Sequence, residues 1–427
     1  MTPEGAEALP LALAGLVLAA LVAFLLTPVA VRLATAVGAI DHPGERRVHQ
    51  EETPRGGGLA VAAGFVIVGL AVLWYDRQDA LTELAFHHPF QEIAVLFGGA
   101  VAAAILGFID DRLDLRARWQ FLGQLVLAGL VVWSGLEVDF VANPFAVGKI
   151  PLTGVFAVGF TAFWIVGMIN SINWIDGLDG LSSGVAAIAA ATLGGISLFV
   201  TPAEPLVGVL CFILAGALAG FLPWNFHPAR IFVGTTGVFL IGYTLAVLSI
   251  LGTAKVAVAL LVLGVPIIDT FWIIVRRVAQ GSSPFAPDRG HLHHRLLDLG
   301  LGQRQVVVLI YGMSAVLAVL SFLLSGRGQL YAFMGIVVGG GLVLYLLTTR
   351  AGDTSTTGLD ASAYEEAQTN GPGRVKAPGG DRSHVRGETR GEDAGAQRDE
   401  TEEHADPARG EEARGEPAGA TGGPGSR

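Results

Sequence analysis

The chain has 427 residues, of which 52% are hydrophobic and only 15% are charged. Soluble domains carry about 25% charged residues, so this composition excludes an ordinary soluble protein and indicates a polytopic membrane protein. Most of the formal net charge of −10 comes from the residues after position 350 and says nothing about a substrate. The single cysteine, Cys211, excludes an internal disulfide framework and a cysteine-based zinc site.

Apolar runs predict about eleven transmembrane helices, because about 20 apolar residues cross a bilayer. Thirteen arginines lie in one set of alternate loops, and four basic residues lie in the other set. Basic loops stay in the cytoplasm, so we expect the N-terminus outside and the arginine-rich loops inside. The expected fold is an all-α polytopic integral membrane protein with spans near residues 9–36, 58–75, 91–109, 118–136, 155–172, 182–200, 205–222, 233–251, 255–276, 304–324 and 329–348.

Two stretches outside these spans have patterns of their own. Asp139 to Thr153 alternates apolar residues with two prolines nearby, which predicts a small hairpin. Residues 351–427 are rich in Gly, Glu, Arg and Asp, with Tyr364 as their one aromatic residue. They cannot bury enough apolar surface to offset the entropy of ordering, so we expect a disordered cytoplasmic tail behind a membrane domain of residues 1–350.

The first cytoplasmic motif is Thr53-Pro-Arg-Gly-Gly-Gly58. Arg55 supplies a cation and the glycines supply open backbone N–H groups, a combination that suits a phosphate. A basic loop with a flexible turn explains the same residues equally well.

Three carboxylates close the third span, in Gly107-Phe-Ile-Asp-Asp-Arg-Leu-Asp114. Asp110 and Asp114 are four residues apart and share a helix face, with Asp111 beside them. Such a group repels itself unless a cation or a basic partner intervenes. One interpretation is a Mg²⁺ ligand beside a general base, and the other is a helix end paired with Arg112, Arg116 and Arg118.

The central stretch, Asn170-Ser-Ile-Asn-Trp-Ile-Asp-Gly-Leu-Asp-Gly-Leu181, ends the fifth span. Its polar side chains recur every third residue and would form a shallow spiral stripe on an α-helix. Its glycines let the backbone unwind or approach a ligand closely. Two amides and two carboxylates at a membrane boundary can hold a hard divalent cation and a polar nucleotide, whereas a simple helix cap needs one such residue. These four residues are Asn170, Asn173, Asp176 and Asp179.

Candidate functional residues also follow the seventh and ninth spans, and one acidic residue lies inside the ninth span. After the seventh span, Phe232 could stack on a nucleotide base or serve as an interfacial aromatic residue. Asp269 lies within the ninth span, where we expect it to be a structural partner. The motif Pro284–Arg295 carries His291, His293 and His294, which could bind zinc, but the nearby carboxylates and arginines fit a hard cation and a diphosphate better.

Together these motifs resemble the polyprenyl-phosphate N-acetylhexosamine-1-phosphate transferases over roughly residues 10–348. The form His-Leu-His-His-Arg-Leu is similar to the branch that uses N-acetylglucosamine. Five motifs occur in the order typical of that family: the Thr53–Gly58 loop, Asp110-Asp111-x-x-Asp114, Asn170-x-x-Asn173-x-x-Asp176-Gly-Leu-Asp179-Gly, Asn225-Phe226 with its glycine loop, and His291-x-His293-His294.

In such enzymes a lipid phosphate attacks the β-phosphate of a UDP-sugar, giving lipid-diphosphate-sugar and UMP. The resemblance implies Mg²⁺, or Mn²⁺ in its place, surrounded by Asp111, Asn173 and Asp176. It implies a catalytic set of Asp110, Asp111, Asp176 and His291. It implies a substrate-binding set of Arg55, Asn170, Asp179, Asn225, Phe232, His293, His294 and Arg295.

The resemblance also implies the partners and the location. The expected substrates are polyprenyl phosphate and a UDP-N-acetylhexosamine, with no nucleic acid. The expected location is a bacterial plasma membrane, with the active site on its cytoplasmic face, for cell-envelope glycan synthesis. A homodimer is one option for the oligomeric state.

One position departs from the family pattern. Its glycine loop normally reads Gly-Asp-x-Gly-Ser, whereas this chain has Gly234-Thr-Thr-Gly-Val238. Thr235 therefore stands where a carboxylate ligand is usual. Either the other carboxylates and water hold the metal, or metal use is altered, or the chain is a catalytically degenerate relative that binds the lipid or nucleotide and regulates. A secondary transporter is disfavoured, because the sequence shows no repeated halves.

Overall fold

The computed structural model describes residues 3–42, 52–79, 89–143, 145–146, 148–200, 203–252, 256–279, 281, 291–324 and 326–350. The chain divides into two units, Met1–Ala361 and Ser362–Arg427, and every described residue belongs to the first. The tail of residues 351–427 lies outside the described residues, so its expected disorder stays a prediction.

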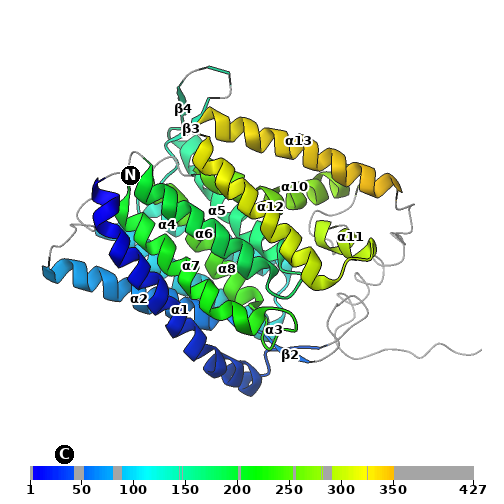
Figure 1. The fold of residues 1–427 in the computed structure, drawn as a ribbon, viewed down its shortest axis with the longest axis horizontal. Coiled ribbons are helices and arrows are strands. Elements are labelled where there is room, and N and C mark those ends of the chain that lie inside the picture. Colours follow the sequence, from blue (N-terminus) through cyan, green and yellow to red (C-terminus); the bar gives the residue numbers. More distant parts are fainter. Residues whose placement is uncertain are drawn as a thin grey trace, which may run out of the picture. The chain divides into compact units, whose positions relative to one another are not determined.

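Helices make up almost all of the described secondary structure (Figure 1). Two short antiparallel pairs accompany them: β1 (Ile40–Asp41) with β2 (Thr53–Pro54), and β3 (Phe140–Ala142) with β4 (Lys149–Pro151). The second pair confirms the hairpin expected between residues 139 and 153. The helices are α1 (Pro3–Val37), α2 (Gly58–Asp79), α3 (Phe90–Leu113), α4 (Ala117–Trp133), α5 (Val155–Ile175), α6 (Leu181–Phe199), α7 (Pro205–Asn225), α8 (Gly234–Leu251), α9 (Val256–Val262), α10 (Gly264–Ala279), α11 (Leu292–Asp298), α12 (Gln303–Leu323) and α13 (Arg327–Arg350).

The number of spans is smaller than the eleven expected. Within the described residues, eight helices are long and apolar enough to cross a membrane, or nine if α9 and α10 form one span with a 78° bend. Every expected span coincides with a helix or with this bent pair. The difference lies in α4, which has only 17 residues, and in α13, whose side chains after residue 342 are outside the described part.

Close contacts between helix backbones hold the bundle together. A Cβ on Gly216 would lie 2.1 Å from the carbonyl oxygen of Leu16, and one on Gly220 would lie 2.0 Å from that of Ala20. Glycine is therefore required for α7 to pack directly on α1, as small residues commonly allow in membrane bundles. Between α3 and α8, the hydroxyl of Tyr243 occupies the space beside Gly99 and donates to the carbonyl of Val95 at 2.7 Å.

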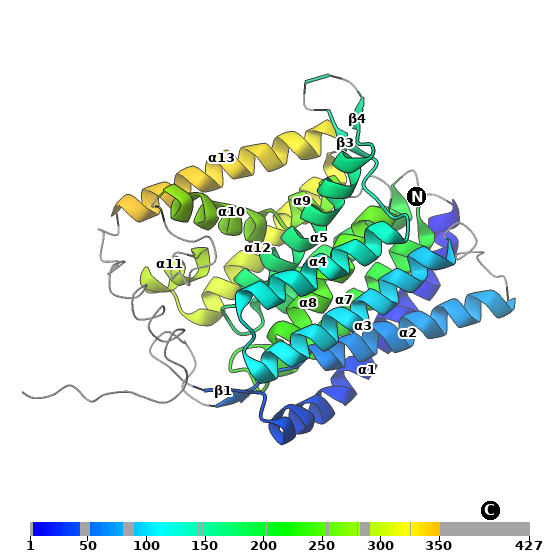
Figure 2. The same ribbon diagram turned by 180° about the vertical axis from the view of Figure 1, so that it is seen from behind.

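The polar motifs gather at one end of the bundle. In both views the β1–β2 pair and the β3–β4 hairpin lie at opposite ends of the helices (Figures 1 and 2). The end that carries β1–β2 also receives the last residues of α3, α5 and α7 and the first residues of α8, because these helices alternate in direction. We call it the motif end.

Candidate active site

Asp111 lies at the centre of the motif end, on the last turn of α3. Its Oδ1 accepts a hydrogen bond from the backbone N–H of Thr235 at 2.8 Å, and its Oδ2 accepts from the N–H of Thr236 at 3.0 Å. The Thr236 hydroxyl donates to the same Oδ2 at 2.6 Å. The first N–H groups of a helix have no partner within the helix and favour negative charge, so the start of α8 fixes this carboxylate in place.

Two glycines make that approach possible. Gly234 has φ +69°, and a Cβ there would lie 2.4 Å from Oδ2 of Asp111. A Cβ on Gly107 would lie 2.3 Å from the carbonyl oxygen of Thr235. The glycine loop thus serves to bring α3 and α8 together, and it places Thr235 directly beside Asp111.

The Thr53–Gly58 loop packs on the same segment. The N–H groups of Gly57 and Gly58 donate to the carbonyls of Phe232 and Val233, both at 2.9 Å. The N–H of Phe232 donates to the carbonyl of Pro54 at 2.9 Å. Two of the N–H groups expected to face a phosphate are therefore used within the protein.

Arg55 extends across the motif end. Its guanidinium bonds to the Asp41 carboxylate, and its Nη1 lies 3.4 Å from Oδ1 of Asp114. Asp114 is the exposed cap of α3, with φ 47°, so it does not share the helix face expected with Asp110. Asp110 accepts hydrogen bonds from the N–H of Leu115 at 3.0 Å and from the Gln120 amide at 2.8 Å, rather than pairing with the neighbouring arginines.

The central stretch is only partly helical. Helix α5 ends at Ile175, so Asp176 and Asp179 lie in the turn before α6 and not on the expected stripe. The Ser182 hydroxyl donates to Oδ1 of Asp176 at 2.5 Å. Burial, with smaller contributions from the charges of Asp111 and Asp179, raises the pKa of Asp176 to about 7, against the lowering effects of the Ser182 hydrogen bond and of Arg55. The two carboxylates and Arg55 therefore form one electrostatic unit.

The histidine motif lies against this turn. A Cβ on Gly177 would be 2.2 Å from Nε2 of His293, a side chain that is 2% exposed. Burial lowers the pKa of His293, and the neighbouring His294 and His291 lower it further. The His291 ring stacks on that of His293 with their centroids 5.5 Å apart, while the ring of His294 is 4.4 Å from that of His293.

Asp269 of α10 anchors the motif. His291 Nδ1 lies 2.8 Å from its Oδ2, and the N–H of Leu292 donates to its Oδ1 at 2.8 Å. Asp269 is thus a structural partner, as expected from the sequence, and its partner is a predicted catalytic residue. The rings of Trp174 and His291 pack edge to face. The Arg277 guanidinium lies over the Trp174 ring, 5.7 Å from its centroid.

Several expected substrate-binding residues bond within the protein. The Asn170 amide donates to Gln124 on α4 at 2.6 Å. Asn225 accepts from the Ser183 hydroxyl and donates to the carbonyl of Ile231 at 3.1 Å. Oδ2 of Asp179 contacts Nδ1 of His227 at 2.7 Å and accepts the N–H of Ala229 at 3.1 Å. Their roles toward a substrate stay predictions, as do those of the half-buried Asn173, Phe232, His294 and Arg295.

Sequence reasoning missed the residues that hold this site. Thr236 and Ser182 support Asp111 and Asp176, and Gln120 supports Asp110. Thr236 adjoins a recognised motif position, but the other two stand on neighbouring helices with no distinctive spacing. Gln120 could be identified only once the turn between α3 and α4 was known, and Ser182 only once the start of α6 was known.

The donor set suits a hydrated cation better than an enclosed one. Within the described ranges, no three His, Cys, Asp or Glu side chains come together to hold a metal ion. The charge of Asp111 nevertheless acts on Asp176, and the Thr235 N–H donates to Asp111. Mg²⁺ usually binds one or two carboxylates and completes its shell with water and substrate phosphates, so these residues fit Mg²⁺ bound together with a diphosphate.

Comparison with known proteins points to one family. Residues 93–253 match the family described as glycosyl transferase family 4. The chain is 35% identical over 311 residues to a probable undecaprenyl-phosphate N-acetylglucosaminyl 1-phosphate transferase of Bacillus subtilis, covering 71% of this chain and 82% of the relative. It is 36% identical over 375 residues to the decaprenyl-phosphate N-acetylglucosaminephosphotransferase of Mycobacterium tuberculosis, covering 80% and 90%. A Salmonella typhi undecaprenyl-phosphate alpha-N-acetylglucosaminyl 1-phosphate transferase is 28% identical over 298 residues, covering 67% and 77%.

Proposed function

The chain belongs to glycosyl transferase family 4, and from this premise we propose that it transfers N-acetylglucosamine 1-phosphate from UDP-N-acetylglucosamine to polyprenyl phosphate. The products are polyprenyl-diphosphate-N-acetylglucosamine and UMP, and the reaction starts a cell-envelope glycan. Relatives with this activity in their names align over most of their own length. The observation that carries the proposal is the unit of Asp111, Asp176 and Arg55 at the motif end.

The reaction exchanges one phosphorus–oxygen bond for another. An oxygen of polyprenyl phosphate attacks the β-phosphorus of UDP-N-acetylglucosamine, and the bond from that phosphorus to the bridging oxygen breaks as UMP leaves. Such a transfer depends mainly on aligning the two phosphates and neutralising their charge. Mg²⁺ bound by Asp111 and Asp176, with Asn173 as a further donor, would supply charge neutralisation.

The chain's own residues supply the alignment. Arg55, which contacts Asp41 and Asp114 at the motif end, would pair with a phosphate oxygen. A carboxylate only accepts hydrogen bonds, so His291 donates Nδ1–H to Asp269 and keeps Nε2 for the substrate. Asp110 would orient the lipid phosphate through the oxygen that does not bond to Leu115 and Gln120.

The location follows from the loop charges. The motif end carries the arginine-rich loops, so we place it on the cytoplasmic face, where UDP-sugars are made available. The long apolar helices support a multi-pass membrane protein and the relatives are bacterial, so a bacterial plasma membrane is the location that we propose.

A substrate panel tests the proposal. Purified protein would be incubated with polyprenyl phosphate, Mg²⁺ and one UDP-sugar at a time, and UMP release would be assayed. We expect UMP with UDP-N-acetylglucosamine and far less with UDP-glucose or UDP-N-acetylgalactosamine. No UMP with any sugar, together with retained binding of UDP-N-acetylglucosamine, would instead identify a degenerate relative that regulates.

A further inference from the structure

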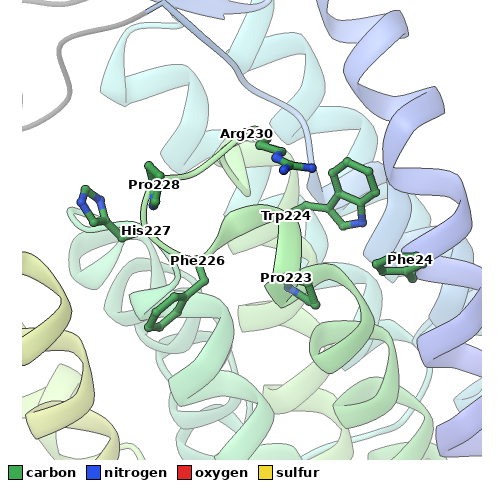
Figure 3. A pocket seen from close by; sticks show the side chains of 7 residues that line it. All are labelled: Phe24, Pro223, Trp224, Phe226, His227, Pro228 and Arg230. Atoms are coloured by element: carbon green, nitrogen blue, oxygen red, sulfur yellow. The ribbon is translucent and has the colours of Figure 1, made fainter.

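A cavity of about 510 Å³ opens beside the loop between α7 and α8 (Figure 3). Its lining combines aromatic rings, prolines and a single arginine, and none of its lining residues is acidic. Neither Asp111 nor Asp176 is among its lining residues. The lining residues are Phe24, Pro223, Trp224, Phe226, His227, Pro228 and Arg230.

Trp224 is the central residue of the lining. Figure 3 shows its indole between Arg230 and Phe24. The Arg230 guanidinium lies 5.5 Å from the centroid of the indole ring, and the Phe24 ring lies 5.5 Å from it. The indole N–H is buried, and no acceptor for it exists among the described residues. An indole nitrogen can only donate, so this group lacks the acceptor that it needs among the described residues.

The cavity lies where a polar loop meets an exposed apolar helix. Helix α1 runs parallel to α7, with Leu16 beside Gly216 and Ala20 beside Gly220. Helix α7 ends one residue after Trp224, but α1 continues to Val37. Along this stretch α1 exposes large apolar side chains, among them Leu21, Leu25 and Val29 at 52%, 59% and 54%. This is the arrangement of a membrane–water boundary, where tryptophan and arginine are commonly placed.

We propose that this cavity binds the phosphate headgroup of an anionic phospholipid. Arg230 would pair with the phosphate, the Trp224 indole ring would pack beside the headgroup, and the acyl chains would lie on the exposed face of α1. An apolar wall beside a lone cation favours a lipid over a free anion, which would gain nothing from Phe24 or from α1.

A bound lipid would brace a loop that supports the active site. His227 of that loop contacts Asp179, and its carbonyl accepts a hydrogen bond from Arg304 at 3.1 Å. Four and five residues further on, Ile231 bonds to Asn225 and Phe232 bonds to the Thr53–Gly58 loop. The inference does not rest on the proposed reaction, since the binding can be measured without turnover.

Tryptophan quenching by brominated lipids tests the binding directly. The full chain would be reconstituted in nanodiscs of phosphatidylcholine, with a small fraction of brominated phosphatidylglycerol or of brominated phosphatidylcholine. We expect more quenching by the anionic lipid than by the neutral one. Trp224→Phe should remove most of that excess, and Arg230→Gln should lower it by at least half.

The chain offers a matched control at the same end of the bundle. Arg118 lies over Trp119 at the same 5.5 Å, but this pair lines no part of the cavity. Trp119→Phe and Arg118→Gln should leave the excess quenching by phosphatidylglycerol unchanged. Equal quenching by the two lipids, or an equal effect of the Arg118 and Arg230 variants, would overturn the proposal.

Competition identifies the occupant. Inorganic phosphate should not relieve the quenching, and neither should stoichiometric polyprenyl phosphate. Relief by inorganic phosphate would mean a simple anion site, and relief by polyprenyl phosphate would mean a part of the substrate site; either result refutes the phospholipid assignment. UMP release by the same samples would test the proposed reaction separately, because the quenching assay measures lipid binding and needs no turnover.

Discussion

Asp269 connects two helices through one carboxylate, since His291 and the start of α11 both bond to it. The side chain is 4% exposed, so bulk water does not replace either contact. It touches no expected substrate position, and it acts by fixing the orientation and tautomer of the His291 ring. A group that orients a reacting histidine in this way commonly contributes about 10- to 100-fold to activity or affinity.

Asp269→Asn should therefore lower kcat by about 10- to 100-fold while KM for UDP-N-acetylglucosamine changes little. The amide keeps the volume but offers an NH₂ group to Nδ1, which disfavours the tautomer that donates there. Steady-state UMP release measures both constants. Thr270→Val, a change at the next buried position of α10, should keep both near wild type; if it matches Asp269→Asn, the effect is packing and not orientation.

Thr235 is the second residue whose substitution we expect to change the reaction, because its N–H donates to Asp111 beside the proposed Mg²⁺ site. A carboxylate introduced here would join Asp111 and Asp176 and strengthen the proposed Mg²⁺ site. Thr235→Asp should lower the Mg²⁺ concentration for half-maximal rate by roughly tenfold, which is about 1.4 kcal/mol. Titration of the rate with Mg²⁺ measures the shift. Thr235→Asn supplies the same shape without charge, and an equal shift in both variants would contradict a charge effect.

At the scale of elements, the turn between α5 and α6 determines how the histidine motif packs. Gly177 leaves room for Nε2 of His293. The His293 ring packs against the rings of His291 and His294, which restrict its rotation. A displacement of about 1 Å between reacting groups can cost up to about 100-fold in rate. The spacing between this turn and α11 is therefore a condition for activity.

Gly177→Ala should reduce kcat/KM between about 10- and 100-fold, because the new methyl group displaces either the turn or α11. The control is Gly167→Ala on α5, where an added Cβ meets nothing within 4 Å. That change should leave activity intact and stabilise the helix slightly. Thermal unfolding would show whether the Gly177 variant stays folded, and wild-type turnover in it would mean that α11 adjusts freely.

The elements were largely predictable, whereas their pairing was not. The apolar runs located the helices, and the alternation near Pro144 and Pro151 located the β3–β4 hairpin, because both signals are local. The single span expected at 255–276 is instead bent by 78°, with Pro266 in the first turn of α10. At the candidate site, the motifs pointed to Asp111 and His291 but not to Thr236 and Asp269 as the residues that contact them, since contacts between distant segments leave no local pattern.

For the whole molecule, the composition separates a membrane domain from the sequence after Arg350. Truncation after Arg350 should leave UMP release within about twofold of wild type, because the removed residues lack the apolar content to build a core. Detergent-purified protein of both lengths would be compared. Truncation after Leu323 is the contrasting variant: it also removes α13, which packs on α9 and α10, and should fail to give stable protein. Lost activity in the first variant would assign the tail a role.

The pairing of α1 with α7 also has a consequence for synthesis. Gly216 meets Leu16 and Gly220 meets Ala20, so about 200 further residues must be synthesised before α1, which also packs on α2, the next helix in the sequence, can pack on α7. At about 5 to 20 residues per second, that interval lasts on the order of 10 to 40 s. Only 22% of the apolar window of α1 is buried in the finished protein, so lipid can solvate this helix while it waits. The late arrival of α7 then covers the second face of α1, and a nascent chain that stalls before residue 205 would leave that face exposed to the membrane's quality-control proteases.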